Sequence, residues 1–273
     1  MNDSRCLSFF NRPDFMNTFV FDIETVPDTK NGRILYHLEN EPCDQKVAEI
    51  MHAKRQEKTG NSGFLPYHLQ RIVSISVALR TQNQFKIGSL GNLNSDEATL
   101  IETFFNCIEK YLPILISWNG GGFDLPILHY RALLYGISSP SYWNIGNEDA
   151  HFRWNNYLSR YHYRHMDLMD ILAAYQSRAS APLQDIAILL GLPGKLGMDG
   201  SQVWDYFLNG KLEAIRNYCE TDVLNTYLIY LRFELIRGNY SLETYQKECA
   251  YIYETLAQES KPHFKQFLNA WNI

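Results

Sequence analysis

The chain has 273 residues, of which 45% are hydrophobic and 20% are charged, so it can bury a sizeable core and is not expected to be disordered. Its formal net charge of −5 argues against a protein that coats duplex nucleic acid by charge alone. An acidic enzyme can still hold a polyanion if clustered carboxylates bind cations, because the cations reverse the local sign of the charge.

The lengths of the apolar runs and the pattern of cysteines indicate where in the cell the protein is located. No apolar run approaches the roughly 18 residues that a membrane-spanning helix needs, and the N-terminus lacks the basic-then-apolar pattern of a signal peptide. The five cysteines are scattered and form no CxxC pair, which indicates reduced thiols and neither a disulfide framework nor a zinc site. We therefore expect a cytoplasmic protein that does not bind membranes.

The first half of the chain alternates between β-rich runs and helical patterns. A strand is predicted at Thr18–Thr25, where Val26-Pro27-Asp28 ends it, and the charged stretch 29–63 follows as a partly helical insertion. Two strands, a helix capped by Ser95, a buried strand and a helix ending at Gly136 come next. Their predicted ranges are Arg71–Arg80, Gln84–Leu90, 95–111, Ile114–Trp118 and Leu125–Tyr135.

The second half of the chain is mostly helical in pattern. An irregular stretch at 138–166 is rich in aromatic and basic residues. The helices predicted after it are Asp167–Gln176, Leu183–Leu190, Gln202–Leu208, Leu212–Arg237, which Gly238 ends, and a C-terminal helix near 241–270. Strands that precede helices around one sheet predict an α/β domain with a mixed central sheet flanked by helices.

Two carboxylates lie on one face of the first predicted strand. Asp22 and Glu24 are two residues apart, so alternation places both side chains opposite those of Phe21 and Ile23. Two adjacent carboxylates repel each other unless a cation lies between them. A solvent-facing edge with two acids is the alternative interpretation of this pair taken alone.

Two further acids follow other elements of the sheet domain. Asn119-Gly120-Gly121-Gly122-Phe123-Asp124 comes directly after a buried strand, where open α/β sheets commonly bind ligands, although an ordinary turn with an acidic helix start fits it as well. Tyr218 and Asp222 are four residues apart in the long helix and therefore share a face. A chance helix flank explains that pair equally well when it stands alone.

Together the three patterns resemble the DEDD superfamily of 3′→5′ exonucleases, in its tyrosine subclass. Within it the chain is similar to the predicted bacterial exonucleases related to the proofreading domain of family B DNA polymerases. The motifs are FVFDIET at 19–25, ISWNGGGFD at 116–124, NYCETD at 217–222, HMDLMD at 165–170 and GKLGMDG at 194–200. The histidine subclass has a histidine where this chain has Asn217.

The resemblance implies a domain plan and a fold. It covers residues 17–238, which we expect to form an RNase H-like 3′→5′ exonuclease domain with 29–63 as its charged insertion. Residues 1–16 are then an N-terminal extension, and residues 239–273 are a C-terminal helical tail.

The resemblance also implies site residues and cofactors. Two divalent ions, Mg²⁺ or Mn²⁺, are expected, because hydrolysis of a phosphodiester by two ions suits a set of oxygen ligands. Asp22 would bridge the ions, Glu24 and Asp222 would complete the site that activates water, and Asp124 would hold the second ion through water. Tyr218 would orient the attacking water. The expected substrate contacts are the backbone at Ile23 and Thr25, a nucleotide pocket at Asn119 and Phe123, and the loop residue Lys195.

Arginines and aromatic residues alternate in the segment His151–His165. Arg160 and Arg164 could meet phosphates while the neighbouring rings stack on the bases of a single strand. Packing of these rings onto the core is an equally good interpretation. His162 and His165 lack a matching third ligand, so we expect them to make polar contacts and not to bind a metal.

The function expected from these patterns is release of nucleoside 5′-monophosphates from the 3′ end of single-stranded DNA or RNA. A catalytically weak nucleic-acid-binding module and an exoribonuclease on the same fold are the alternatives. A nicotinamide-dependent oxidoreductase is disfavoured, because the glycines of residues 119–124 lack the spacing of a dinucleotide-binding loop. The patterns leave the choice of DNA or RNA and the protein partners open.

Overall fold

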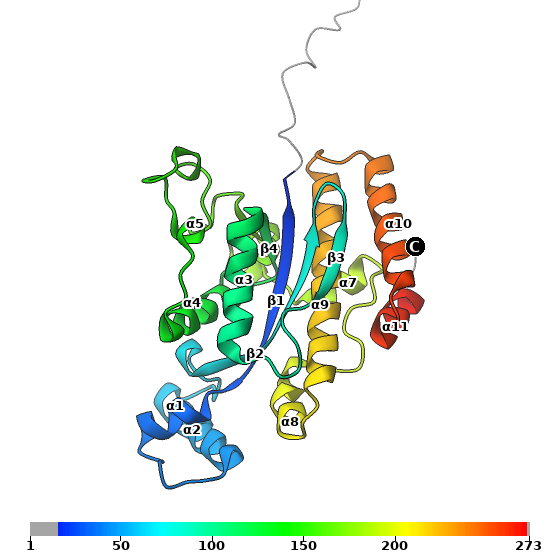
Figure 1. Ribbon diagram of the computed structural model, residues 1–273. Coiled ribbons are helices and arrows are strands. Elements are labelled where there is room, and N and C mark those ends of the chain that lie inside the picture. The colour runs from blue at the N-terminus through cyan, green and yellow to red at the C-terminus, as the bar shows by residue number, and fades with distance from the viewer. Residues whose placement is uncertain (1–15, 272–273) are drawn as a thin grey trace, which may run out of the picture.

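A computed structural model of the chain describes residues 16–271 (Figure 1). The predicted N-terminal extension therefore lies, except for Met16, outside the described residues. No helix in the described part of the chain is long and apolar enough to cross a membrane.

A mixed five-stranded sheet forms the centre of the domain, with the strand order β3-β2-β1-β4-β5. The strands are β1 Thr18–Pro27, β2 Gln70–Arg80, β3 Phe85–Ser89, β4 Ile114–Ser117 and β5 His165–Asp167. β1, β2 and β3 pair in antiparallel fashion, whereas β4 and β5 run parallel to β1. The predicted RNase H-like α/β fold with a mixed sheet is confirmed.

Helices cover both faces of this sheet (Figure 1). In chain order, those of the described residues are α1 Thr29–Tyr36, α2 Asp44–Thr59, α3 Glu97–Tyr111, α4 Asp124–Tyr135, α5 Pro140–Trp143, α6 Leu168–Leu172, α7 Leu183–Leu189, α8 Val203–Leu208, α9 Leu212–Ile236, α10 Leu242–Gln258 and α11 Pro262–Ala270. Short 3₁₀ turns at Tyr67–Leu69, Ala150–Phe152, Ser177–Ala179 and Gly200–Gln202 connect some of them.

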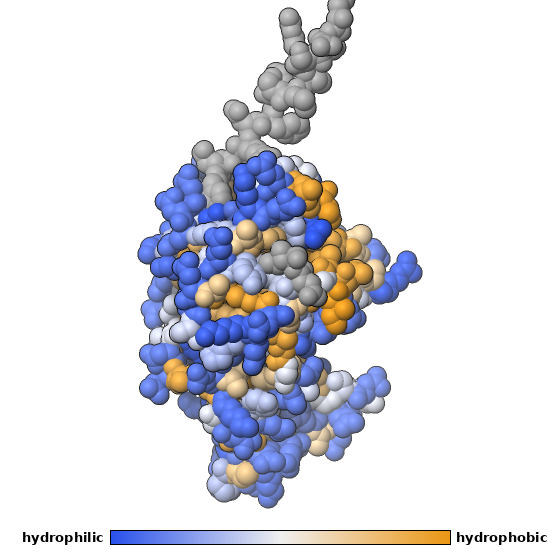
Figure 2. Space-filling model, turned by 90° about the vertical axis from the view of Figure 1, so that its right-hand side faces the viewer, coloured by the Kyte–Doolittle hydropathy of each residue, from blue (hydrophilic) through white to orange (hydrophobic). Residues whose placement is uncertain are grey.

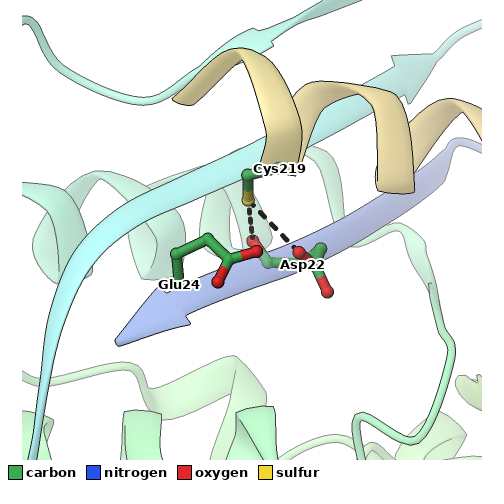
Figure 3. A group of neighbouring side chains, drawn as sticks. All are labelled: Asp22, Glu24 and Cys219. Atoms are coloured by element: carbon green, nitrogen blue, oxygen red, sulfur yellow. Dashed lines mark hydrogen bonds between the residues drawn. The ribbon is translucent and has the colours of Figure 1, made fainter. Parts of the chain in front are cut away.

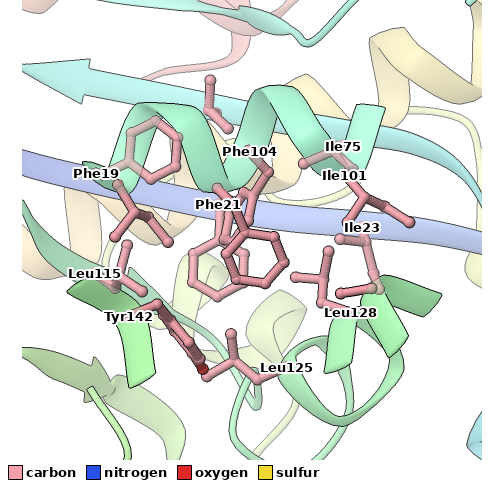
Figure 4. Packing of buried hydrophobic residues seen from close by; sticks show 14 of the residues in the cluster. Phe19, Phe21, Ile23, Ile75, Ile101, Phe104, Leu115, Leu125, Leu128 and Tyr142 are labelled. Atoms are coloured by element: carbon pink, nitrogen blue, oxygen red, sulfur yellow. The ribbon is translucent and has the colours of Figure 1, made fainter. Parts of the chain in front are cut away.

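Alternation along β1 decides which side chains face which layer. Phe19, Phe21 and Ile23 pack against α3 and α4 in one core (Figure 4). Val20 points to the other side, into the core that α9 closes. Asp22 and Glu24 have the parity of Val20, so this strand directs them toward α9.

Three predicted elements need correction. Asp96, not Ser95, caps α3 and accepts a hydrogen bond from the Thr99 backbone N–H. The helix predicted at Asp167–Gln176 is the short strand β5 followed by α6, because residues 165–167 pair with β4. The single C-terminal helix near 241–270 is two helices, since Pro262 starts a new one.

The charged insertion 29–63 contains α1 and α2, which pack on each other beside the C-terminal end of β1 (Figure 1). Val47 and Met51 of α2 form a small core with Leu65 and Leu69. The insertion is thus partly a packed unit and not only a solvated surface.

On another side of the molecule, the face near α10 and α11 is mostly hydrophilic with smaller hydrophobic patches (Figure 2).

Candidate metal centre

β1 brings two carboxylates into a largely enclosed space beneath α9. Glu24 is 8% exposed and Asp22 is half-buried. Burial raises the pKa of each carboxyl well above its ordinary value, and the negative charges of the neighbouring acids raise it further. The register of β1 against β2 shifts between Glu24 and Thr25, directly after this pair.

Helix α9 supplies a thiol to the same place. The sulfur of Cys219 lies 3.3 Å from Oδ2 of Asp22 and 3.4 Å from the backbone oxygen of Asp22. One ligand atom each from Asp22, Glu24 and Cys219 lie within 4.8 Å of one another (Figure 3). The sequence-based prediction missed Cys219, although it precedes Asp222 by three residues and therefore shares its face of the helix.

The two residues predicted from α9 are both buried. Tyr218 is 6% exposed and Asp222 is 7% exposed. Burial raises the pKa of Asp222 to about 6, an effect that the nearby Tyr218 hydroxyl and Lys195 partly offset. Oδ1 of Asp222 is buried and has no hydrogen-bond partner among the described residues. A buried oxygen of this kind is rare unless a ligand or water satisfies it.

Asp124 reaches the site from the other side of β1. It is the first residue of α4, and its Oδ1 accepts a hydrogen bond of 3.0 Å from the backbone N–H of Ile23. That N–H is free of β4, because β4 pairs with β1 only from Thr18 to Val20. Burial raises the pKa of Asp124 to about 7, while the Ile23 hydrogen bond opposes the rise. This hydrogen bond fixes Asp124 beside the backbone of Ile23, the residue between Asp22 and Glu24.

The glycine-rich loop before Asp124 is held by Asp167 at the end of β5. The carboxylate of Asp167 accepts hydrogen bonds of 2.9 Å from the backbone N–H groups of Asn119 and Gly121. A side chain at position 120 would come within 2.3 Å of the Ser117 hydroxyl, so glycine is required there. Asp167 also caps α6 and thus links that helix to the loop.

Two of the predicted substrate contacts flank the carboxylates. The Lys195 ammonium lies 5.7 Å from the centre of the Tyr218 ring, and its charge lowers the pKa of Asp22, Glu24 and Asp222. Phe123 is half-buried, and its ring packs 6.1 Å from that of Phe64, which follows α2.

Arg160 and Arg164 lie away from the carboxylates. Arg164 donates to the backbone oxygen of Leu112, just before the start of β4, and its guanidinium lies over the Phe152 ring. Since β1 and β4 are parallel, this is the opposite end of the sheet from Asp22. Arg160 pairs with Asp170 at 2.8 Å. The structure does not bring either arginine to the cluster.

The aromatic residues around these arginines divide between the two interpretations. Phe152 and Tyr157 are 4% and 2% exposed and pack into the core, as the packing interpretation predicts. Trp154, Tyr161 and Tyr163 are 63–81% exposed. His162 and His165 make polar contacts, as expected: His162 accepts from the Asn156 backbone N–H, and His165 hydrogen-bonds to Ser117.

The charges of the four acids fit a cation. The charges of Asp124 and Asp222 raise the pKa of both Asp22 and Glu24, so all four carboxylates share one electrostatic site. Asp124 and Asp222 lie outside the tightest set of ligand atoms, which is that of Asp22, Glu24 and Cys219. A divalent ion would relieve this repulsion and satisfy the buried oxygen of Asp222.

The chain is similar to parts of two archaeal DNA polymerases. A DNA polymerase of Archaeoglobus fulgidus is 28% identical over 153 residues, which are 55% of this chain and 19% of the polymerase, so the chain spans less than a fifth of that protein's length. The solved family B DNA polymerase of the hyperthermophilic archaeon Pyrobaculum calidifontis has 16% identity and a TM-score of 0.46 over 79% of this chain and 25% of its own.

A protein-family model matches residues 62–271. The match includes Asp124, Tyr218 and Asp222. It begins after β1, so it does not include Asp22 and Glu24, which lie on that strand. The model's description confirms the relation to a polymerase exonuclease domain that the motifs predicted. The chain belongs to the family of predicted 3′-5′ exonucleases related to the exonuclease domain of PolB.

Proposed function

We propose that this chain hydrolyses the terminal phosphodiester bond at the 3′ end of a single-stranded nucleic acid and releases nucleoside 5′-monophosphates one at a time. The observation that carries this proposal is the shared electrostatic site of Asp22, Glu24, Asp124 and Asp222, with the unpartnered buried oxygen of Asp222. Tyr218 lies beside Asp222, which supports our assignment of the chain to the tyrosine subclass of such enzymes.

Two divalent ions, Mg²⁺ or Mn²⁺, are the cofactors that we assign to this site, because its carboxylates offer the oxygen ligands that these ions prefer. When bound, such a pair lowers the pKa of the attacking water and stabilises charge on the phosphate and the leaving oxygen. Asp22 would take part in holding both ions, Glu24 and Asp222 would hold the ion that activates water, and Asp124 would hold the other.

The protein's own part in the chemistry is to position the reactants. Tyr218 orients the attacking water by a hydrogen bond. Burial raises the pKa of the Tyr218 phenol, and the charges of Asp222, Glu24 and Asp22 raise it further, so the hydroxyl keeps its proton near neutral pH. Tyr218 therefore acts as a positioning group and not as a general base.

The strand end is held by residues that flank the carboxylates. The backbone at Ile23 and Thr25 contacts the terminal sugar, Asn119 and Phe123 line the nucleotide pocket, and Lys195 meets a phosphate. Arg160 and Arg164 are left out of this set, because Arg164 is bonded near the start of β4 and Arg160 is paired with Asp170 of α6.

The test is hydrolysis of an end-labelled single-stranded oligonucleotide in Mg²⁺ and in Mn²⁺. Wild-type protein should shorten the strand from its 3′ end, and Asp22→Ala and Asp222→Ala should lower the rate by at least about a thousandfold, which corresponds to a loss of roughly 4 kcal/mol. Asp185→Ala, which removes an exposed carboxylate on α7, is the matched control and should keep the wild-type rate.

Two outcomes would contradict the proposal. Wild-type turnover by folded Asp22→Ala or Asp222→Ala protein would refute the site. Binding of the strand without hydrolysis in either metal would leave only a nucleic-acid-binding module. DNA and RNA strands of the same sequence, run side by side, distinguish a deoxyribonuclease from an exoribonuclease.

A further inference from the structure

The thiol of Cys219 has no part in the proposed hydrolysis, yet it lies among the metal-binding carboxylates. Cys219 is fully buried, and its sulfur is 3.3 Å from Oδ2 of Asp22 (Figure 3). Mg²⁺ takes oxygen ligands, whereas thiolate selects softer ions such as Zn²⁺. The thiol is therefore a ligand that the proposed cofactors leave unused.

The spacing of these groups suits a tetrahedral ion. A metal–sulfur bond of about 2.3 Å and a metal–oxygen bond of about 2.1 Å place sulfur and oxygen ligands roughly 3.6 Å apart. The observed separation of 3.3 Å between the Cys219 sulfur and Asp22 Oδ2 is close to this, and Glu24 completes a set whose atoms lie within 4.8 Å of one another.

A second observation at the same place points to a bound cation. Asp222 is 7% exposed, and its buried Oδ1 has no hydrogen-bond partner in the described part of the chain. Asp222 is one turn beyond Cys219 on α9, and its charge acts on both Asp22 and Glu24. Its unpartnered oxygen belongs to the same electrostatic site, although it lies outside the set of atoms within 4.8 Å of one another.

We propose that Asp22, Glu24 and Cys219, with Asp222, form a site for a thiophilic divalent ion such as Zn²⁺ or Cd²⁺. The ion takes the carboxylates that Mg²⁺ or Mn²⁺ would use, so it inhibits hydrolysis; this consequence rests on the proposed function, whereas the binding does not. A metal–sulfur bond forms, the S–H bond breaks, the proton leaves to water, and no oxidation state changes.

The experiment titrates the purified full-length chain with Cd²⁺ and follows the ultraviolet thiolate-to-Cd²⁺ charge-transfer absorption. Wild-type protein should show a tight phase of one ion per chain. Cys219→Ser should lose this phase, and Glu24→Gln should weaken it at least about tenfold, because a direct ligand matters no less than the outer-shell groups whose loss has that effect. Cys249→Ser, which alters another buried thiol in α10, should keep it.

Competition on the unaltered protein guards against a variant that fails to fold. Excess Mn²⁺ should raise the Cd²⁺ concentration at half-saturation at least about tenfold, because both ions need Asp22 and Glu24. A tight phase that survives in folded Cys219→Ser protein, or one that Mn²⁺ does not affect, would overturn the inference.

An activity arm separates this inference from the proposed function. In Mg²⁺, Zn²⁺ should inhibit wild-type protein, and Cys219→Ser should need at least about tenfold more Zn²⁺ for the same fractional inhibition. Absence of hydrolysis in every protein would refute the proposed function, while the Cd²⁺ titration would still decide the binding site. If wild-type and Cys219→Ser protein were both active and equally sensitive to Zn²⁺, the inhibitory role of Cys219 would be overturned, but the binding site would not.

Discussion

At the scale of single residues, a variant of Tyr218 can show whether this residue orients the attacking water or removes its proton. Its buried phenol has a pKa raised by burial and by three neighbouring carboxylates, so it cannot serve as a base near neutral pH. Tyr218→Phe should lower kcat about 10- to 100-fold, since loss of alignment alone can have an effect of that size. The affinity for Mn²⁺ should stay within about twofold of wild type.

Single-turnover kinetics and Mn²⁺ titration measure these two effects separately. Tyr253→Phe, on α10, is the matched control and should leave both unchanged. If Tyr218→Phe instead weakened Mn²⁺ binding in proportion to its loss of rate, the hydroxyl would be acting on the metal site and not on the water.

The raised carboxyl pKa values predict a pH dependence of metal binding. Burial raises the pKa of Asp124 to about 7 and that of Asp222 to about 6, so both groups gain protons as the pH falls from 8 to 5. A proton and a cation compete for the same oxygen, so the apparent Kd for Mn²⁺ should rise up to about tenfold per pH unit below each pKa. Calorimetric titration of Mn²⁺ at several pH values measures this, and a Kd that is constant from pH 8 to pH 5 would contradict the shared electrostatic site.

At the scale of elements, Glu220 joins α9 to β3 and α11. Its carboxylate accepts hydrogen bonds from the Ser89 backbone N–H, from Lys261 and from His263, at 2.8–3.1 Å. Burial alone would raise the pKa of Glu220, but the hydrogen bonds from His263 and Lys261 outweigh it and lower the pKa to about 2.

A lowered pKa means that folding favours the ionised form of Glu220. Its stabilisation is therefore present above the ordinary value of 4.5 and is lost as the pH falls toward 2. Glu220→Gln should lower the free energy of unfolding by about 3 kcal/mol at pH 7 and by less at pH 3. Urea unfolding measures the difference. Glu213→Gln, at an exposed position of the same helix, is the control and should have little effect. If the loss of unfolding free energy in Glu220→Gln were as large at pH 3 as at pH 7, the ionised form of Glu220 would not be its source.

Elements with a strong local pattern could be predicted from the sequence. β1, β2 and α9 carry their own periodicity, and Gly136 ends α4 in the left-handed conformation that the residue type favours. β5 has only three residues, and pairing with β4, not a local pattern, makes it a strand. The break before α11 was visible in the sequence as Pro262, but the prediction passed over it.

The site follows the same division. Asp22, Glu24, Asp124 and Asp222 could be named from spacing and family resemblance. The spacing along α9 shows that Cys219 shares the face of Asp222, but the thiol meets Asp22 only because α9 packs across β1, and no local pattern shows that contact. The basic, aromatic segment around Arg164 predicts a phosphate contact for this residue. In the structure Arg164 instead donates to the backbone oxygen of Leu112, fifty-two positions earlier in the chain.

At the scale of the whole molecule, α10 and α11 belong to the core that α9 closes. Ile252, Leu256, Phe264 and Phe267 are fully buried in the same cluster as Val20 and Leu228. The sequence-based boundary at residue 238 treats these helices as a tail. Their packing indicates that removing them would expose the apolar side of α9 to water, which an isolated domain does not tolerate well.

We therefore expect a chain that ends at Gly238 to lose cooperative unfolding. Phe264→Ala in the full chain should lower the free energy of unfolding by about 3–5 kcal/mol, a large share of the roughly 5–15 kcal/mol of a typical domain. Leu242→Ala, at a position that is 59% exposed, should change it by no more than about 0.5 kcal/mol. Urea unfolding followed by circular dichroism measures all three proteins. If the chain ending at Gly238 unfolded cooperatively with the stability of the full chain, residues 239–273 would be a separable tail after all, and the carboxylate site would depend on β1, α4 and α9 alone.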